Sequence, residues 1–178
     1  YLSYVLSTGK DGNGNEQTGA PGDWSTYITD GDGAEGLEIE ISFQQGLYAM
    51  DDEGQSHETS VTIEVEYARE GSGGSTSFMR WDIANGGTIK RRKLKPFTMN
   101  YKLEHITPGR YHVRARCIRK DTVNPERGAN LITWTKLSSI VYQPMIHPNK
   151  ALLGVKIRAT EQLSGGMPTI TWTQTRKT

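Results

Sequence analysis

The chain has a single cysteine, Cys117, so it cannot close a disulfide within itself. This absence excludes the small secreted domains that several disulfides hold together. It fits a protein that folds in a reducing compartment, or one that needs no cross-links. A chain of 178 residues can bury one sizeable core, as a single sandwich with a small appendage does.

An excess of one charge is also missing. Lysine and arginine number 21 and aspartate and glutamate 20, so the formal net charge is +1. Dedicated nucleic-acid-binding proteins usually carry a strong basic excess, so the balance argues against that class, although a local basic patch stays open.

No apolar run approaches the length of a membrane span, and no secretory signal pattern opens the chain. The first residue is Tyr1 rather than methionine, so we expect a segment of a longer polypeptide.

A helical period is missing as well, because no segment repeats apolar residues every 3.6 positions over three turns. Apolar and polar residues alternate instead, with β-branched and aromatic side chains on one face, as in half-buried antiparallel strands. The predicted strands cover residues 37–43, 60–68, 78–83, 97–106, 111–117, 131–142, 151–160 and 168–175. Short strands joined by glycine-rich turns predict an all-β sandwich.

The composition changes twice along the chain. Residues 9–36 are rich in Gly, Asp, Asn and Thr, which is typical of a loop or linker, and "QPMIHPNK" holds two prolines. We therefore expect residues 1–36 to be a glycine-rich linker or a partial strand of a preceding domain. Residues 37–145 are expected to form the β-sandwich domain, and residues 146–178 a linker and the start of a following β element.

Two basic stretches invite a polyanion-binding hypothesis. In "PGRYHVRARCIRKD" the arginines of a strand share one face with His112, opposite the apolar residues. Because residues 38–40 and 64–66 supply acidic faces, we favour a solvated strand face that complements acidic strands. "IKRRKLKPF" places five basic residues in positions 90–95, which we interpret as a solvated loop or edge strand rather than a contact for an acidic partner or phosphate.

No metal or cofactor site is predicted. Asp11, Asn13 and Asn15 alternate as in a calcium loop, but Glu16 stands where that loop needs glycine. A second stretch offers only Asp30 and Asp32 before the pattern ends. The histidines show no ligand spacing, and we expect each on a surface or strand: His57, His105, His112 and His147.

Nothing in the sequence points to an enzyme, and no catalytic residue is predicted. The chain lacks a G-x-S-x-G elbow, and "GSGGSTS" lacks the lysine of a phosphate-binding loop. The acidic run at residues 51–53 lies in a predicted turn. The four tryptophans leave an alternative open: exposed, they would stack on sugars in a carbohydrate-binding module, and buried, they would anchor the sandwich. We expect Trp134 in or near the core and Trp24 as the best candidate for exposure.

Four segments in order resemble the tip attachment (host specificity) J proteins of lambda-like long-tailed phages and prophages. They are "ISFQQGLYAMDDEGQSHETSVTIEVEYARE", "PGRYHVRARCIRKD", "LITWTKLSSIVY" and "NKALLGVKIRATEQLSGGMPTI", which together cover roughly residues 37 to 170. The departures are Gln44-Gln45 in place of a proline-containing phrase and Cys117 in place of arginine or valine. Residues 9–36 match nothing in the family.

The resemblance implies a fibronectin type III-like antiparallel β-sandwich with a glycine-rich N-terminal segment and a short C-terminal β extension. It implies a non-enzymatic scaffold of the tail-tip hub, which links the tail to host-receptor binding and DNA delivery. The implied partners are other tail-tip subunits, including copies of the chain in a trimeric hub, and a bacterial outer-surface receptor bound through the full-length protein. No sequence-specific nucleic-acid binding is implied, and no receptor-binding residue is carried over.

The implied location is the virion tail tip, assembled in the bacterial cytoplasm from a phage or prophage gene. The alternative function is a carbohydrate- or protein-binding sandwich module of a bacterial surface protein. An exposed platform of two or more aromatic side chains would favour that alternative.

Overall fold

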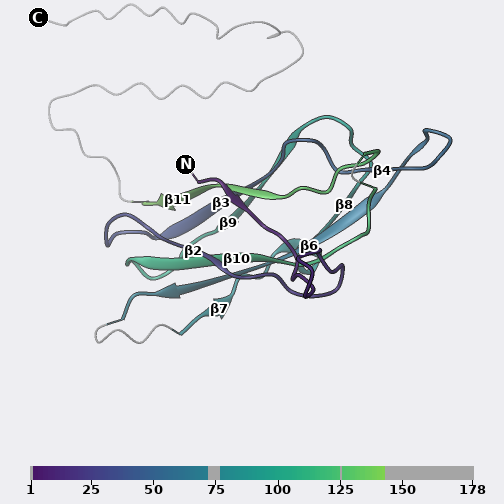
Figure 1. Cartoon of the computed structure of the whole chain (residues 1–178). Coiled ribbons are helices and arrows are strands. Elements are labelled where there is room, and N and C mark those ends of the chain that lie inside the picture. The colour runs from purple at the N-terminus through teal and green to yellow at the C-terminus, as the bar shows by residue number, and fades with distance from the viewer. Residues whose placement is uncertain (1, 72–76, 125, 143–178) are drawn as a thin grey trace, which may run out of the picture. The chain divides into compact units, whose positions relative to one another are not determined.

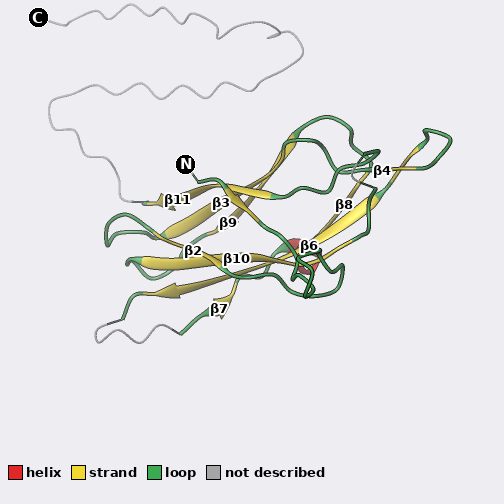
Figure 2. Ribbon diagram, viewed as in Figure 1, coloured by secondary structure: helices red, strands yellow, loops and turns green. Residues whose placement is uncertain are grey.

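The computed structural model describes residues 2–71, 77–124 and 126–142. These residues form β-strands and one short 3-10 turn at Ala84–Gly87, with no α-helix among them (Figure 2). All strand pairs in this part of the chain are antiparallel. The all-β antiparallel fold predicted from the two-residue period is therefore confirmed.

The strands form two main sheets that lie face to face (Figure 1). The first sheet has the order β1-β11-β3-β9, with bounds Tyr4–Val5, Thr133–Ile140, Gly36–Phe43 and Phe97–Leu103. The second has the order β2-β10-β6-β7, with β8 also paired to β6. Its bounds are Ser25–Ile28, Tyr111–Lys120, Thr59–Arg69, Met79–Arg80 and, for β8, Thr88–Arg91. A small hairpin pairs β4, Ala49–Met50, with β5, Ser56–His57.

The core lies between the two sheets and follows the alternation of the sequence. In β3 every second side chain is fully buried, whereas Glu38, Glu40 and Ser42 are half-buried on the other face. β6 and β10 repeat the pattern towards the same interior. Each buried aliphatic side chain stabilises the fold by about 1.5–3 kcal/mol. The largest of the fully buried side chains are Trp134, Phe43, Leu37, Ile39, Ile41 and Leu47.

The N-terminal segment differs from the loop expected over residues 9–36. β2 lies inside it and pairs with β10, and β1 pairs with β11 further upstream. Leu6 and Ala34 are buried in the common core, at 3% and 1% exposure. β2 could not be predicted from the sequence, because it has only four residues and lies in a glycine-rich segment. Its pairing partner, β10, is far along the chain.

The last described strand lies in a different sheet from the strand before it. β11 follows β10 along the chain but pairs with β3, and β2 occupies the place beside β10. Both ends of the described chain therefore cover strand edges of the central sandwich. This arrangement makes the N-terminal segment part of the sheet hydrogen bonding.

One turn depends on glycine for steric reasons. Gly87 has a φ of +81°, and a Cβ there would lie 2.1 Å from the carbonyl oxygen of Ile63. Only glycine fits this approach, which brings the turn between β7 and β8 against β6.

The two strands predicted at 151–160 and 168–175 lie outside the described residues, as does the whole element predicted for residues 146–178. No helix in the part of the chain that the structure describes is long and apolar enough to cross a membrane.

Candidate functional site

The outward face of the second sheet carries two arginine–glutamate pairs between neighbouring strands. In the register of β10 with β6, Arg114 lies opposite Glu66 and Arg116 opposite Glu64. Arg114 donates from Nε to Glu66 Oε2 at 2.7 Å, and its Nη2 lies 2.5 Å from the same oxygen. Arg116 donates from Nε and Nη2 to Glu64 Oε2 at 2.9 and 2.7 Å.

Two aromatic rings lie against these guanidinium groups. The Cζ atoms of Arg114 and Arg116 are 4.3 and 4.2 Å from the ring centre of Trp24, which directly precedes β2. Arg114 is also 3.8 Å from the ring centre of Phe78, directly before β7. We call these six side chains the arginine ladder: Trp24, Phe78, Arg114, Arg116, Glu64 and Glu66.

The arginine ladder engages Arg114 and Arg116, the two central arginines of "PGRYHVRARCIRKD", with partners from the same chain. Each guanidinium has a carboxylate in its plane and an aromatic ring against its face, so neither is free to bind a polyanion. The interpretation of a strand face that complements an acidic strand is confirmed for residues 64–66 of β6, whereas residues 38–40 lie on β3 in the other sheet and do not pair with β10. The sequence did not indicate the aromatic contacts, because Trp24 meets Arg116 only through β2, which was not predicted.

The second basic stretch has few partners. Lys90 lies 3.2 Å from Glu58, and Lys93 lies over the ring of Phe97, 5.0 Å from its centre. The Arg91 side chain donates to the carbonyl oxygen of its neighbour Lys90. Two further cations, Arg92 and Lys95, have no acidic partner among residues 2–71, 77–124 and 126–142. The prediction of a loop or edge strand is confirmed, because β8 ends at Arg91 as an edge strand on β6 and residues 92–96 form a loop.

The calcium-like loop is held by its own hydrogen bonds. Asp11 Oδ1 accepts the backbone N–H groups of Asn13 and Asn15 at 2.8 and 2.9 Å. These donors favour the carboxylate and lower the pKa of Asp11 below its ordinary value. No group of three or more His, Cys, Asp or Glu side chains able to hold a metal occurs in the described ranges.

The three described histidines lie at separate places. His57 Nε2 lies 2.6 Å from Asp51 Oδ2 in the β4–β5 hairpin, and this contact lowers the pKa of the Asp51 carboxyl group. His112 lies 3.9 Å from Glu70, and the ring of His105 stacks on Tyr142 with a 5.1 Å centre-to-centre distance. They do not converge on one site. His147 lies outside the described residues.

Cys117 is buried in the core at 0% exposure, facing inward from β10. Burial raises the pKa of its thiol to about 11. A thiol that stays protonated and covered does not act as a nucleophile.

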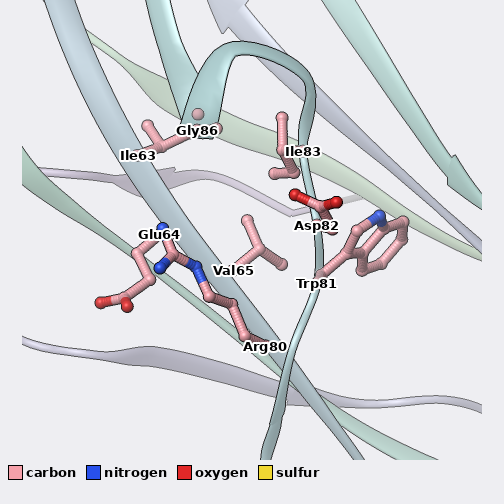
Figure 3. Close-up of a pocket in the computed structure, with 9 residues that line it drawn as sticks. Ile63, Glu64, Val65, Arg80, Trp81, Asp82, Ile83 and Gly86 are labelled. Atoms are coloured by element: carbon pink, nitrogen blue, oxygen red, sulfur yellow. The ribbon is translucent and has the colours of Figure 1, made fainter.

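A small pocket beside β6 has two acidic residues in its lining, and the Glu64 carboxylate points away from that of Asp82 in Figure 3. Glu64 and Asp82 line it with Arg80, Trp81 and neighbouring residues, and the segment from Arg80 to Ile83 forms one wall in Figure 3. The free space holds no more than about one water molecule. Glu64 is already paired with Arg116, so this pocket cannot place a sugar between two free carboxyl groups.

The described tryptophans do not form an exposed platform. Trp81 and Trp134 are buried at 3% and 0% exposure, and Trp24 is half-buried under two guanidinium groups. The core position of Trp134 is confirmed, and Trp24 is less exposed than expected. Trp172 lies outside the described residues.

A family model for the FNIII-A domain of tip attachment protein J matches residues 20–143, more than half of the chain. The chain belongs to the tip attachment protein J family. The match begins at residue 20 and includes β2, so the expectation that residues 9–36 match nothing in the family is wrong for residues 20–36. The comparison with curated proteins gives no match.

Membership of the J family makes this chain a module of a phage tail-tip attachment protein with a fibronectin type III-like fold. The family is structural, its place is the virion tail tip, and its partners are other tail components. The resemblance to the J family is therefore confirmed, and three of the four segments that carried it lie within residues 20–143, whereas the fourth, residues 149–170, lies beyond the match.

Proposed function

We propose that this chain acts as a non-enzymatic scaffold in the tail-tip hub, linking the tail to host-receptor binding and DNA delivery. The observation that carries the proposal is the arginine ladder on a matched FNIII-A domain. Its charged and aromatic side chains bind one another across β2, β10, β6 and the segment before β7. A surface whose polar groups are already paired keeps its shape, which is what a scaffold requires.

The proposed partners are other tail-tip subunits, including copies of this chain in a trimeric hub. Contact with a bacterial receptor is assigned to the full-length protein, and the proposed assembly takes place in the bacterial cytoplasm from a phage or prophage gene. Since Arg114 and Arg116 of β10 are engaged, we assign no sequence-specific nucleic-acid binding to this sheet.

An adsorption experiment separates the scaffold from a binding module. The purified chain is added in excess to host bacteria before a phage that carries it in its tail tip, and the chain is also applied to a glycan array. We expect unchanged phage adsorption and no retained glycan. Concentration-dependent blocking of adsorption, or specific glycan binding, would identify a binding module instead.

A second experiment tests the scaffold role directly in the phage. Ile41→Asp buries a charge between the sheets, and we expect tails without a complete tip in electron micrographs. The control Arg119→Ala changes an exposed residue of β10 and should leave tips complete. Normal tips in the Ile41→Asp phage would contradict the proposal.

A further inference from the structure

A polar groove lies where the N-terminal segment meets both sheets. It is lined by Val5 of β1, by residues of the segment that follows β1, and by Asp23 and Ser25 around the start of β2. Because β1 is the edge strand of the first sheet and β2 that of the second, the groove borders an edge of each. Its free space is about 600 Å³, which is within the range of small-molecule sites.

The backbone fixes the walls of this groove. The N–H group of Gly9 donates to the carbonyl oxygen of Ala20 at 2.7 Å. The N–H group of Gly22 donates to the carbonyl oxygen of Cys117 at 2.8 Å. A Cβ at Gly22 would clash with the carbonyl oxygen of Ser7, so glycine is what allows these two segments to approach so closely. The groove is therefore preformed, which lowers the entropic cost of binding a ligand.

Two opposite charges line the groove without pairing. The side chains of Lys10 and Asp23 are exposed, and neither forms an ion pair within residues 2–71, 77–124 and 126–142. The two charges therefore lie on one groove but too far apart to neutralise each other directly. A ligand with one ammonium group and one carboxylate carries the complementary pair of charges.

A buried hydroxyl group in the lining also lacks a partner. Thr8 is 2% exposed, and its Oγ1 is buried without a hydrogen-bond partner in the described part of the chain. Buried polar groups in folded proteins almost always have a partner, because leaving one without it costs free energy. Ser7 and Ser25 add two half-buried hydroxyl groups to the same lining. A polar ligand on this wall supplies the partner that Thr8 lacks.

We propose that the groove binds a small zwitterion of the amino-acid or short-peptide class. Asp23 accepts hydrogen bonds from the ammonium group of the ligand, and Lys10 donates to its carboxylate. The hydroxyl groups bind the polar atoms between these two ends. A sugar is a poorer match, because no aromatic ring occurs among the described lining residues for it to stack on. This site lies beyond the scaffold role and does not depend on it.

The test is a titration of the full 178-residue chain with glycine, diglycine and triglycine, followed through amide chemical shifts in nuclear magnetic resonance. The three probes carry the same two charges at increasing separations. We expect at least one of them to shift the amide signals of Gly9 and Ser25, with a dissociation constant of about 1 mM or below. The N-acetylated and C-amidated forms of that probe each lack one charge and should bind about tenfold more weakly.

Three groove variants show which group holds which end of the ligand. Asp23→Asn should weaken the free probe about tenfold and leave the N-acetylated form unchanged, and Lys10→Met should do the same with the C-amidated form. Thr8→Val should weaken binding without lowering the thermal midpoint of the free protein, since it removes a hydroxyl group that has no partner. The control Asp32→Asn changes an exposed acid outside the lining and should bind as the wild type does.

The inference is overturned if none of the three probes shifts these signals at about ten times the expected constant. Equal binding of the free and capped forms would overturn it as well, because the two charges would then not be recognised. Wild-type affinity in any of the three groove variants would place the ligand elsewhere. Circular dichroism gives the thermal midpoint of every variant. None of these outcomes bears on the scaffold role, which the adsorption and tail-tip experiments test.

Discussion

Arg114 shows how one side chain connects several strands. From β10 it reaches Glu66 on β6 and the rings of Trp24 and Phe78, before β2 and β7. The flat guanidinium group allows this, because it donates hydrogen bonds in its plane and stacks through its faces. A lysine here would keep the charge and lose the stacking.

The Arg114–Glu66 pair should show measurable coupling. In a double-mutant cycle with Arg114→Ala and Glu66→Ala, we expect a coupling free energy of about 1 kcal/mol, since both side chains are mostly shielded from solvent. The measurement is urea denaturation of the four proteins. Lys102 and Glu38 form the control pair, at 3.6 Å and more exposed on the lysine side, and should couple by less than about 0.5 kcal/mol. Equal coupling in the two pairs would contradict a special role for the ladder.

Cys117 should be inert in the folded protein. Its thiol pKa is raised to about 11, so at pH 8 the folded chain should not react with an alkylating reagent until denaturant is added. A raised thiol pKa stabilises the fold fully below the ordinary value near 9, and this contribution is lost as the pH rises towards 11. Mass spectrometry after timed alkylation measures the reaction. Rapid labelling without denaturant would contradict this burial.

At the scale of elements, the short strands β1 and β2 cover edges that would otherwise be open. β2 lies along β10 and β1 along β11, which are both long strands with fully buried side chains. Uncovered strand edges pair readily with other chains. The domain division predicted at residue 36 can therefore be tested through the stability of the sandwich.

Removing residues 1–36 should destabilise the remaining chain and make it aggregate. The point substitution Leu6→Ala tests the same contribution gently, and we expect a loss of about 2–5 kcal/mol because this side chain is buried. Val5→Ala is the control. The side chain of Val5, next to Leu6 in the chain, is 53% exposed, so this substitution should change the free energy of unfolding by less than about 0.5 kcal/mol. Chemical denaturation and size-exclusion chromatography measure both effects. An unchanged midpoint for Leu6→Ala would support the linker predicted from composition.

The strands that alternate over seven or more residues were predictable from the sequence. β3 alternates between buried and half-buried side chains after Gly36, and β9 alternates between half-buried and exposed ones. β6 alternates as far as Val65 and β10 as far as Cys117, with the predicted side chains facing the core. β1 and β2 were not predictable, because two and four residues are too few to show a period. The position of Trp24 in the arginine ladder was not predictable either, because Trp24 directly precedes the short strand β2.

At the scale of the whole molecule, both sheets bury side chains in one core, so the sandwich should unfold as a unit. Ile41→Ala in the first sheet and Val113→Ala in the second should each lower the free energy of unfolding. For the isoleucine we expect a loss of about 2–5 kcal/mol. Tryptophan fluorescence and far-ultraviolet circular dichroism should give coincident transitions in both variants. Separate transitions would show that the sheets unfold independently.

The sequence by itself determined the strand alternation, the all-β class and the membership of the J family. These depend on local order along the chain, which is why they could be read without coordinates. Only the tertiary structure decided which basic residues are engaged. Arg114 and Arg116 meet carboxylates 48 and 52 residues away, whereas Arg92 and Lys95 meet none among the described residues. Both stretches are similarly basic in sequence, and the difference comes from strand pairing, which places acids beside one and leaves the other at an edge.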